Sequence, residues 1–548
     1  MSTDDQTMGG PQPRQWSWQD RARGSLLVGA ALIPYLDQET GWRIFPTAYL
    51  PDRLLVSRAG ELEQNVDALQ QAAGELGLSL TRQRLDGTPL EDNEPVEPGF
   101  PGAPTVLRLQ LDPGDSTAVP DAWQVLQRAR RITRSKLTGV GLDHIVSIDP
   151  VQLNPFTHTN PFTHTNPFTH TNPFTHTNPF TKTNPFTKTN PFTKTNPFTK
   201  TNPAGEYADA GSGGRQPVAW VGAAPVRSPD KRHSGRRPVV AVLDTGCGEH
   251  DWLPDDIVTR EVFLDGVPLG LTDAANPEIY PDLYGPLDGE IDPVAGHGTF
   301  IAGLIRQAAP DADLLCIRAA DALGVVAESS LLTIIEQLGV LLWRYRNRKK
   351  GGRPIDVLNL SLSYYHETPE DGYFSLALFD ALKALRLMGC VVVASAGNDA
   401  IDRPAFPAAL WPWPGSDNGL QPDPGTKPLA VGALNPSLRS TALFSNVGPW
   451  VNAYAPGAAV VSTIPAFQGG LQATARDDYD GRRRETIDPD DYRGGFAIWS
   501  GTSFAAPLVA GRVAAALTDA LTTGSPEPLP GEKAVALADD AIGRALDR

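Results

Sequence analysis

Cysteine is scarce in this chain, and no uninterrupted apolar stretch reaches the length of a membrane span. Three cysteines in 548 residues, Cys247, Cys316 and Cys390, are too few for a disulfide framework and too far apart for a zinc site. They indicate a reducing compartment, and we expect a cytoplasmic protein. A membrane helix needs roughly 18–20 apolar residues in a row, so we expect no membrane partner.

Positive charge is also in deficit, with 47 Lys and Arg against 63 Asp and Glu and a net charge of −16. Binding to nucleic acid or to anionic lipid needs a basic face, so we expect neither partner. The apolar content of 41% is ample for a buried core. The 52 Gly and 51 Pro exceed an average share and predict extra loops on a globular body.

The most apolar segment near the N-terminus is 25–36, SLLVGAALIPYL, which follows a polar leader over 1–24. It allows two interpretations. The segment could be a signal sequence that directs the protein to export, but no small-residue cleavage site follows it. We therefore predict a buried strand, with secretion left open as the alternative.

A hexapeptide repeat fills residues 154–201, reading NPFTHT four times and then NPFTKT four times. Each Asn-Pro step disfavours helix and removes a donor from any strand. Units this short and polar cannot build a solenoid core. We predict a solvated linker with a mean span of about 40 Å. A metal-binding histidine run and a docking array for a partner are the alternatives; the histidines are His158, His164, His170 and His176.

Before the repeat, helix and strand patterns alternate. The apolar residues from Leu62 to Leu76 recur at helical spacing. Strands are expected at 53–57, 78–81, 105–111 and 144–148, with a second helix after Pro120. The order strand-helix-strand-strand-helix-strand predicts a small ferredoxin-like α+β domain over 25–150.

After the repeat, residues 202–237 are rich in Gly, Arg and Pro and predict a second flexible linker. From 238 onward, the runs PVVAVLD, DVLNLSL, CVVVASAG and LAVGAL are short, apolar and β-branched, as in parallel strands covered on both faces. Helical segments at 329–345 and 374–388 separate them. We predict a doubly wound α/β domain with a mostly parallel sheet over 238–520, then a tail with a short helix over 521–548.

Four polar residues stand where such a fold carries functional groups, at strand ends and helix starts. Asp244 and Asn398 each follow an apolar strand, while His297 and Ser503 each precede an apolar helix. Each has a structural alternative, because Asp commonly caps a turn and Ser commonly caps a helix. Asp-Thr-Gly also occurs in aspartic proteases, a reading that would require a homodimer here.

The order of these residues narrows the interpretation. Asp, then His, then Ser is the order of the subtilisin-type triad, distinct from the other serine hydrolase orders. The surrounding sequences VAVLDTG, GHGTFIAG, ASAGN and GTSFAAPLVAG resemble those of the subtilisin-like serine peptidases. The resemblance extends from Pro238 to about Leu517, and we expect a bacterial source.

The resemblance implies acyl transfer on a protein or peptide substrate. Ser503 would attack the carbonyl, His297 would move the proton, and Asp244 would hold the imidazole. The Asn398 side chain and the Ser503 backbone N–H would stabilise the oxyanion. No cofactor is required for this chemistry. Many family members bind calcium, but no metal ligands are assigned in this sequence.

The resemblance also implies two backbone segments, near 324–326 and 360–362, that pair with an extended substrate. The predicted substrate-binding residues are Gly324, Val325, Leu360, Ser361, Leu362, Ser363, Ala396 and Gly397. Ser363 and Ala405 stand where the family often has glycine, which favours medium apolar side chains over large aromatic ones in the specificity pocket.

Subtilisin-like enzymes are commonly made with a pro-domain of the topology expected for 25–150, which blocks the substrate cleft. We therefore expect the N-terminal domain to be an intramolecular partner and inhibitor, tethered by the repeat. The leading hypothesis is an autoinhibited serine endopeptidase, or zymogen. The alternative is a catalytically silent scaffold that binds peptides.

Overall fold

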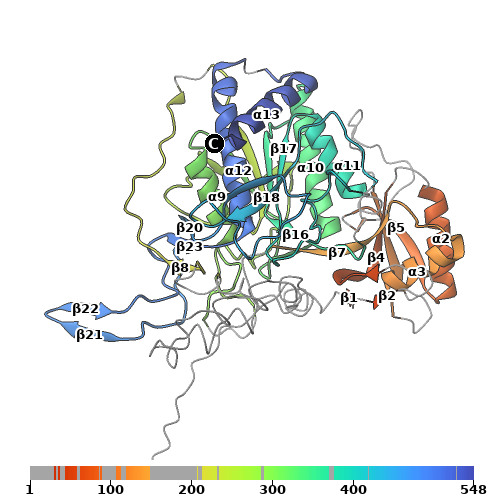
Figure 1. Cartoon of the computed structure of the whole chain (residues 1–548), viewed down its shortest axis with the longest axis horizontal. Helices are drawn as coiled ribbons and strands as arrows, with labels where there is room; N and C mark the ends of the chain where they lie inside the picture. The colour runs from red at the N-terminus through yellow and green to blue at the C-terminus, as the bar shows by residue number, and fades with distance from the viewer. Residues whose placement is uncertain are drawn as a thin grey trace, which may run out of the picture.

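The computed structural model contains a small N-terminal α+β domain beside a larger α/β domain (Figure 1). The structure describes residues 30–32, 35–36, 43–57, 62–85, 87–88, 106–112, 119–148, 207, 213–230, 234–284, 289–368, 376–416, 419–525 and 527–547. The leader over 1–24 and the hexapeptide repeat lie outside the described residues, so the predictions for both stay predictions.

The N-terminal domain has the predicted order of elements, and its sheet runs β7–β4–β6–β5 with every pair antiparallel. This is the strand order of the ferredoxin-like fold, which confirms the prediction. The elements are β4 (Thr47–Ser57), α2 (Leu62–Glu75), β5 (Ser79–Gln83), β6 (Val106–Asp112), α3 (Ala122–Thr133) and β7 (Val140–Ile148).

Both helices of this domain follow from local sequence signals. The helical apolar spacing of α2 puts Val66, Leu69 and Ala73 in the core, against the sheet. At the start of α3, the Asp121 carboxylate accepts hydrogen bonds from the backbone N–H of Trp123 at 3.0 Å and of the next residue. A capped helix start and a single apolar face explain why both helices could be predicted.

Strand β4 begins well before the predicted start at residue 53. Its pairing with β7 is irregular between Leu50 and Leu54, an interval that contains Pro51. Proline is tolerated within sheets at such irregularities, so the strand continues through it. The extra length pairs with β1 (Ala30–Leu32), which lies within the apolar segment 25–36. The short strands β2 (Tyr35–Leu36) and β3 (Arg43–Ile44) pair with each other.

Seven parallel strands form the central sheet of the larger domain, in the order β10–β13–β9–β15–β17–β18–β19. Alternate residues along β9 belong to two different cores, with Val242 in one and Leu243 in the other. Helices α9, α12 and α13 cover the first core, and α10 and α11 cover the second (Figure 1). The doubly wound fold is therefore confirmed.

The strands of this sheet are β9 (Val239–Asp244), β10 (Val258–Thr259), β13 (Asp313–Arg318), β15 (Val357–Leu360), β17 (Val391–Ser395), β18 (Leu429–Leu434) and β19 (Ala453–Pro456). The helices are α9 (His297–Ala308), α10 (Glu328–Arg346), α11 (Leu376–Leu387), α12 (Thr502–Thr523) and α13 (Gly531–Leu546). Smaller strands are β8 (Gln216–Pro217), β11 (Phe263–Leu264), β12 (Val267–Pro268), β14 (Val325–Ala327), β16 (Leu362–Ser363), β20 (Val460–Thr463) and β23 (Phe496–Trp499).

By length and composition alone, α12 could cross a membrane. Arg512 and Asp519 interrupt its apolar residues, so the sequence contains no unbroken apolar stretch of that length here. The helix is the core helix of the larger domain, where it contacts α9, α13 and several strands of the sheet. A buried core helix of this kind is weak evidence for a membrane span.

The C-terminal part of the chain is more ordered than a tail. Helix α12 continues to Thr523, past the predicted domain boundary at 520, and α13 then packs against both α12 and α11. The short helix predicted over 521–548 therefore belongs to the helical layer of the larger domain.

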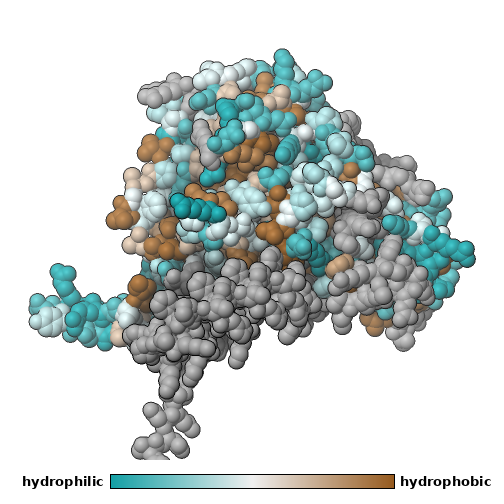
Figure 2. Space-filling view, viewed as in Figure 1, coloured by the Kyte–Doolittle hydropathy of each residue, from teal (hydrophilic) through white to brown (hydrophobic). Residues whose placement is uncertain are grey.

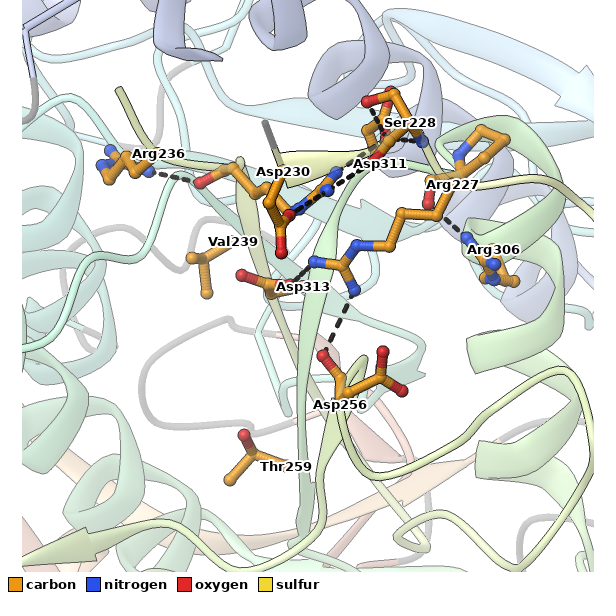
Figure 3. A network of polar contacts seen from close by, with 12 residues as sticks. Arg227, Ser228, Asp230, Arg236, Val239, Asp256, Thr259, Arg306, Asp311 and Asp313 are labelled. Atoms are coloured by element: carbon orange, nitrogen blue, oxygen red, sulfur yellow. Dashed lines mark hydrogen bonds and ion pairs between the residues drawn. The ribbon is translucent and has the colours of Figure 1, made fainter. Parts of the chain in front are cut away.

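The structure differs from the prediction of a flexible linker over 202–237. Within this range, Arg227 forms an ion pair with Asp313 (Figure 3). Arg237 forms another with Asp311 at 2.7 Å. These contacts hold the segment against the N-terminal end of β13. Composition could not reveal them, because each arginine is more than 70 residues from its partner.

A hairpin of β21 (Arg476–Tyr479) and β22 (Arg482–Glu485) projects from the larger domain (Figure 1). Every residue in both strands is exposed, and the hairpin is largely hydrophilic (Figure 2). It shares no buried core with the larger domain.

Candidate active site

Topology brings the four predicted catalytic residues to one edge of the central sheet. Asp244 is the last residue of β9, and Asn398 lies three residues after β17. His297 is the first residue of α9, and Ser503 lies in the first turn of α12. All four are buried. Carboxyl ends of parallel strands meet at one edge, which is where α/β folds place their sites.

Asp244 orients His297. The Nδ1 atom of His297 lies 2.7 Å from Oδ1 of Asp244, and the same oxygen accepts the backbone N–H of Thr245 at 2.8 Å. Because the carboxylate accepts a hydrogen bond from Nδ1–H, the neutral ring carries its lone pair on Nε2. Among the described residues, that Nε2 has no hydrogen-bond partner. The arrangement leaves His297 able to accept a proton there.

The hydroxyl of Ser503 forms no hydrogen bond with His297 in this structure. Its Oγ donates to the backbone oxygen of Ser361, at 3.4 Å, and no hydrogen bond joins it to Nε2 of His297. Catalytic hydrogen bonds are often long or misaligned without substrate and tighten only in the complex with it. The structure therefore joins Asp244 to His297 and holds Ser503 beside the chain segment at 361.

Asn398 is tied to the helix that carries Ser503. Its Oδ1 accepts the backbone N–H and the hydroxyl of Thr502, both at 2.8 Å. These bonds satisfy a donor at the start of α12, where Gly501 offers no side-chain cap. With the amide oxygen used in this way, Nδ2 is the end of Asn398 that can donate to an oxyanion.

Glycine is required where α9 approaches the loop after β9. A Cβ atom added to Gly298 would lie 2.1 Å from the backbone oxygen of Gly246, which no side chain could avoid. Gly296 caps the helix with a φ of +79°, a left-handed conformation that favours glycine. The glycines that flank His297 thus bring it within reach of Asp244.

The sequence did not reveal Glu278, a buried carboxylate beside this pair. Its Oε1 accepts the hydroxyl of Thr245 and, at 2.9 Å, the backbone N–H of Gly298. Its other oxygen accepts the backbone N–H of Thr299 at 3.3 Å. Glu278 therefore caps the helix that carries His297 and also binds the residue after Asp244. Burial raises the pKa of Glu278, against the hydrogen bonds that lower it.

The second half of β7 lies between two strands of the larger domain. Ser147 pairs with Val325 of β14 on one side and with Ser363 of β16 on the other, both antiparallel. The backbone N–H of Ile148 donates to the backbone oxygen of Gly324 at 2.7 Å. The first half of β7 pairs with β4 in its own domain, so this strand joins the N-terminal sheet to two short strands of the larger domain.

The predicted substrate-binding residues divide into two groups. Gly324, Val325, Leu362 and Ser363 all contact β7 through the backbone. The others are near Ser503 or Asn398 in the fold: Leu360 ends β15, Ser361 accepts the Ser503 hydroxyl, and Ala396 and Gly397 precede Asn398. On the second segment, the described pairing includes Leu362, which lies within the predicted 360–362, and continues to Ser363.

Among the described residues, one group has the spacing to hold a metal ion: His144, His366 and Glu367, whose ligand atoms lie within 4.8 Å of one another. It lies where β7 meets the larger domain. No calcium site follows from these residues, since calcium prefers a shell of six to eight oxygens. The expectation that no cofactor is required stays a prediction.

Comparisons with known proteins agree on one family. The model of the Subtilase family matches residues 235–532, more than half of the chain. The intracellular serine protease of Paenibacillus polymyxa is 28% identical over 292 residues, covering 51% of this chain and 66% of the relative. The major intracellular serine protease of Bacillus subtilis is 27% identical over 248 residues, covering 42% and 61%. The chain thus spans less than two thirds of these relatives.

A solved structure, fervidolysin from Fervidobacterium pennivorans, described as a keratinolytic enzyme related to subtilisin, is 19% identical. The match covers 86% of this chain and 55% of that one, with a TM-score of 0.41.

Proposed function

Because the chain belongs to the subtilase family, we propose that it is a serine endopeptidase held latent by its own N-terminal domain. Its substrates are then polypeptides. The observation that carries the proposal is β7, which pairs with β14 and β16 as an extended substrate would, and β16 directly follows Ser361, which contacts Ser503.

In the proposed mechanism, Ser503 Oγ turns from the oxygen of Ser361 toward Nε2 of His297. The imidazole takes the hydroxyl proton as Oγ attacks the peptide carbonyl, and it returns that proton to the leaving amine. Asp244, at 2.7 Å from Nδ1, stabilises the imidazolium that forms. Water then repeats the sequence on the acyl-enzyme and regenerates the hydroxyl.

Two donors suit the oxyanion of the tetrahedral intermediate. One is the backbone N–H of Ser503 at the start of α12, where helix N–H groups have no partner within the helix. The other is Nδ2 of Asn398, whose oxygen is engaged by Thr502. Loss of one such donor costs about 10²–10³ in kcat in subtilisin, the enzyme from which this magnitude comes.

In this proposal the peptidase is latent because β7 occupies the place where a substrate would bind. A strand that is hydrogen-bonded on both edges excludes a second polypeptide from the same place, and β7 is anchored at its other end in the sheet of the N-terminal domain. The tether keeps the two domains at a roughly millimolar effective concentration, so even a moderate affinity keeps the enzyme closed. Cutting the tether would let dilution separate them.

A cytoplasmic location belongs to the same proposal. The described cysteines are all unpaired and buried, as expected in a reducing compartment. Two of the relatives carry the word "intracellular" in their names. Activity in the cytoplasm would make a built-in inhibitor useful.

The test uses a fluorophosphonate probe for Ser503 and a peptide substrate on the same samples. The intact chain should react and hydrolyse slowly, and the chain cut within 154–201 should do both faster after dilution. Ser503→Ala is the control and should do neither. Absence of labelling in every form would favour the peptide-binding scaffold, and equal rates for cut and intact chains would refute latency.

A further inference from the structure

A histidine on β7 is enclosed by two carboxylates of the larger domain. The Nδ1 atom of His144 lies 2.7 Å from Oε2 of Glu328, and its Nε2 lies 3.0 Å from Oε2 of Glu367. The three side chains are 1%, 3% and 0% exposed. A carboxylate at each ring nitrogen makes both nitrogens donors, so the ring is an imidazolium with two charge-assisted hydrogen bonds.

The two carboxylates belong to the segments that hold β7. Glu328 is the first residue of α10, directly after β14, and Glu367 lies four residues after β16. The positive charge, in contrast, comes from the strand that lies between them. Within the described residues, Oε1 of Glu367 has no hydrogen-bond partner. Without β7, the larger domain would keep both carboxylates at this place, where its own contacts are long: Nδ1 of His366 lies 3.4 Å from Oε2 of Glu367, and the Tyr364 hydroxyl lies 3.4 Å from Oε1 of Glu328.

The strand register gives the position of this pair relative to the reaction. Ile148 lies opposite Leu362, and the residue before Leu362 is Ser361, whose backbone oxygen lies 3.4 Å from Ser503 Oγ. In a substrate bound in the same register, one residue lies opposite Leu362 and the next lies opposite Ser361. The carbonyl of that next residue is the one presented to Ser503. Counting back from that residue, His144 takes the sixth position before the scissile bond.

We propose that Glu328 and Glu367 form a specificity pocket for a basic side chain at the sixth position before the scissile bond. His144 is the internal occupant of this pocket and imitates that side chain. The inference rests on the proposed peptidase function and names its substrate class, extended polypeptides with Arg, Lys or protonated His at that position. A neutral side chain would cost these two desolvated carboxylates their charge-assisted hydrogen bonds, and a site built to hydrogen-bond a polar group strongly rejects a ligand that lacks that group.

A metal ion is the competing interpretation of the same cluster. His366 and Glu367 could each supply one ligand to it, with His144 as the third. However, both nitrogens of His144 already face carboxylates, and Nδ1 of His366 accepts the backbone N–H of Thr368 at 3.2 Å. These contacts favour an organic cation over a metal.

The experiment uses the full chain cut within 154–201 and diluted. Its substrates copy residues 143–148, followed by leucine and a fluorogenic amide, and differ only at the residue corresponding to His144. The measured quantity is the ratio of kcat/KM for the Arg peptide to that for the Gln peptide. We expect a ratio of about 10 or more, falling to about 1–2 in Glu328→Gln/Glu367→Gln. The exposed Glu532→Gln on α13 is the matched control and should keep the wild-type ratio.

The outcomes separate the two proposals. If neither peptide is hydrolysed, the proposed peptidase function fails. Equal hydrolysis of the Arg and Gln peptides by the wild-type protein overturns the pocket alone, and it does so even if the double variant fails to fold. A preference that EDTA abolishes and added Zn²⁺ restores would also overturn it, in favour of the metal.

Discussion

Replacing His144 with glutamine should release the N-terminal domain. The change removes the positive charge and one ring nitrogen, and it leaves Glu328 and Glu367 buried around a neutral side chain. Burial opposes the charge of His144, but the hydrogen bonds to the two glutamates raise its pKa from 6.5 to about 10. That difference corresponds to about 5 kcal/mol in favour of the docked imidazolium. Breaking a buried ion pair costs about 3–5 kcal/mol, which agrees in scale.

The expected change in the open fraction is therefore at least about a hundredfold at acidic to neutral pH. The titratable or charged groups that face His144 and its partners are Glu328, Glu367, His366, Asp143, Arg53 and Arg130. A histidine with a raised pKa contributes its full stabilisation below 6.5 and loses it as the pH rises toward about 10. Glu367, whose pKa is lowered by the nearby His366 and His144 against its burial, loses its contribution as the pH falls below 4.5. Docking should be tightest between these limits.

The assay is peptide hydrolysis by the intact chain from pH 5 to 9, divided at each pH by that of the chain cut in the repeat. This division removes the pH dependence of catalysis itself. The wild type should lose latency as the pH rises above 6.5, whereas His144→Gln should be active and nearly independent of pH. His158→Gln, a histidine in the repeat, is the control. Equal latency in His144→Gln and the wild type would refute the reasoning.

Further changes test the catalytic site and the tether. Ser503→Ala and His297→Ala should each abolish hydrolysis, and the double variant should be scarcely worse, because the two act as one unit; multiplicative losses in kcat would contradict this. Glu278→Gln should lower kcat/KM by about 10–100-fold and shift the acidic limb of the pH profile to lower pH, since a negative charge near His297 is lost; an unmoved limb would leave Glu278 a structural role only. Removing half of the repeat should change the residual activity of the intact chain by only about threefold, and a change above about tenfold would exclude a flexible tether.

The sequence alone determined the features that are written in local patterns. Runs such as PVVAVLD predict buried parallel strands because both faces of the sheet are covered, and helical spacing from Leu62 predicted α2 within one residue of its end. The motifs around Asp244, His297 and Ser503 contain residues that the local backbone requires, such as the glycine at 298, which approaches Gly246 closely. Their order in the chain was enough to indicate the family.

Only the tertiary structure decided which distant residues meet. Glu278 has no motif, and its role depends on lying beside Thr245 and the start of α9. Glu328 and Glu367 lie 184 and 223 residues after their partner His144, a separation at which no periodicity or spacing rule applies. From the sequence, the arginines at 227 and 237 likewise resembled linker residues, because the carboxylates that pair with them are adjacent only in the folded protein. Local sequence sets the conformation of each segment, but a charge is paired or unpaired only once packing has chosen its neighbours and removed the water between them.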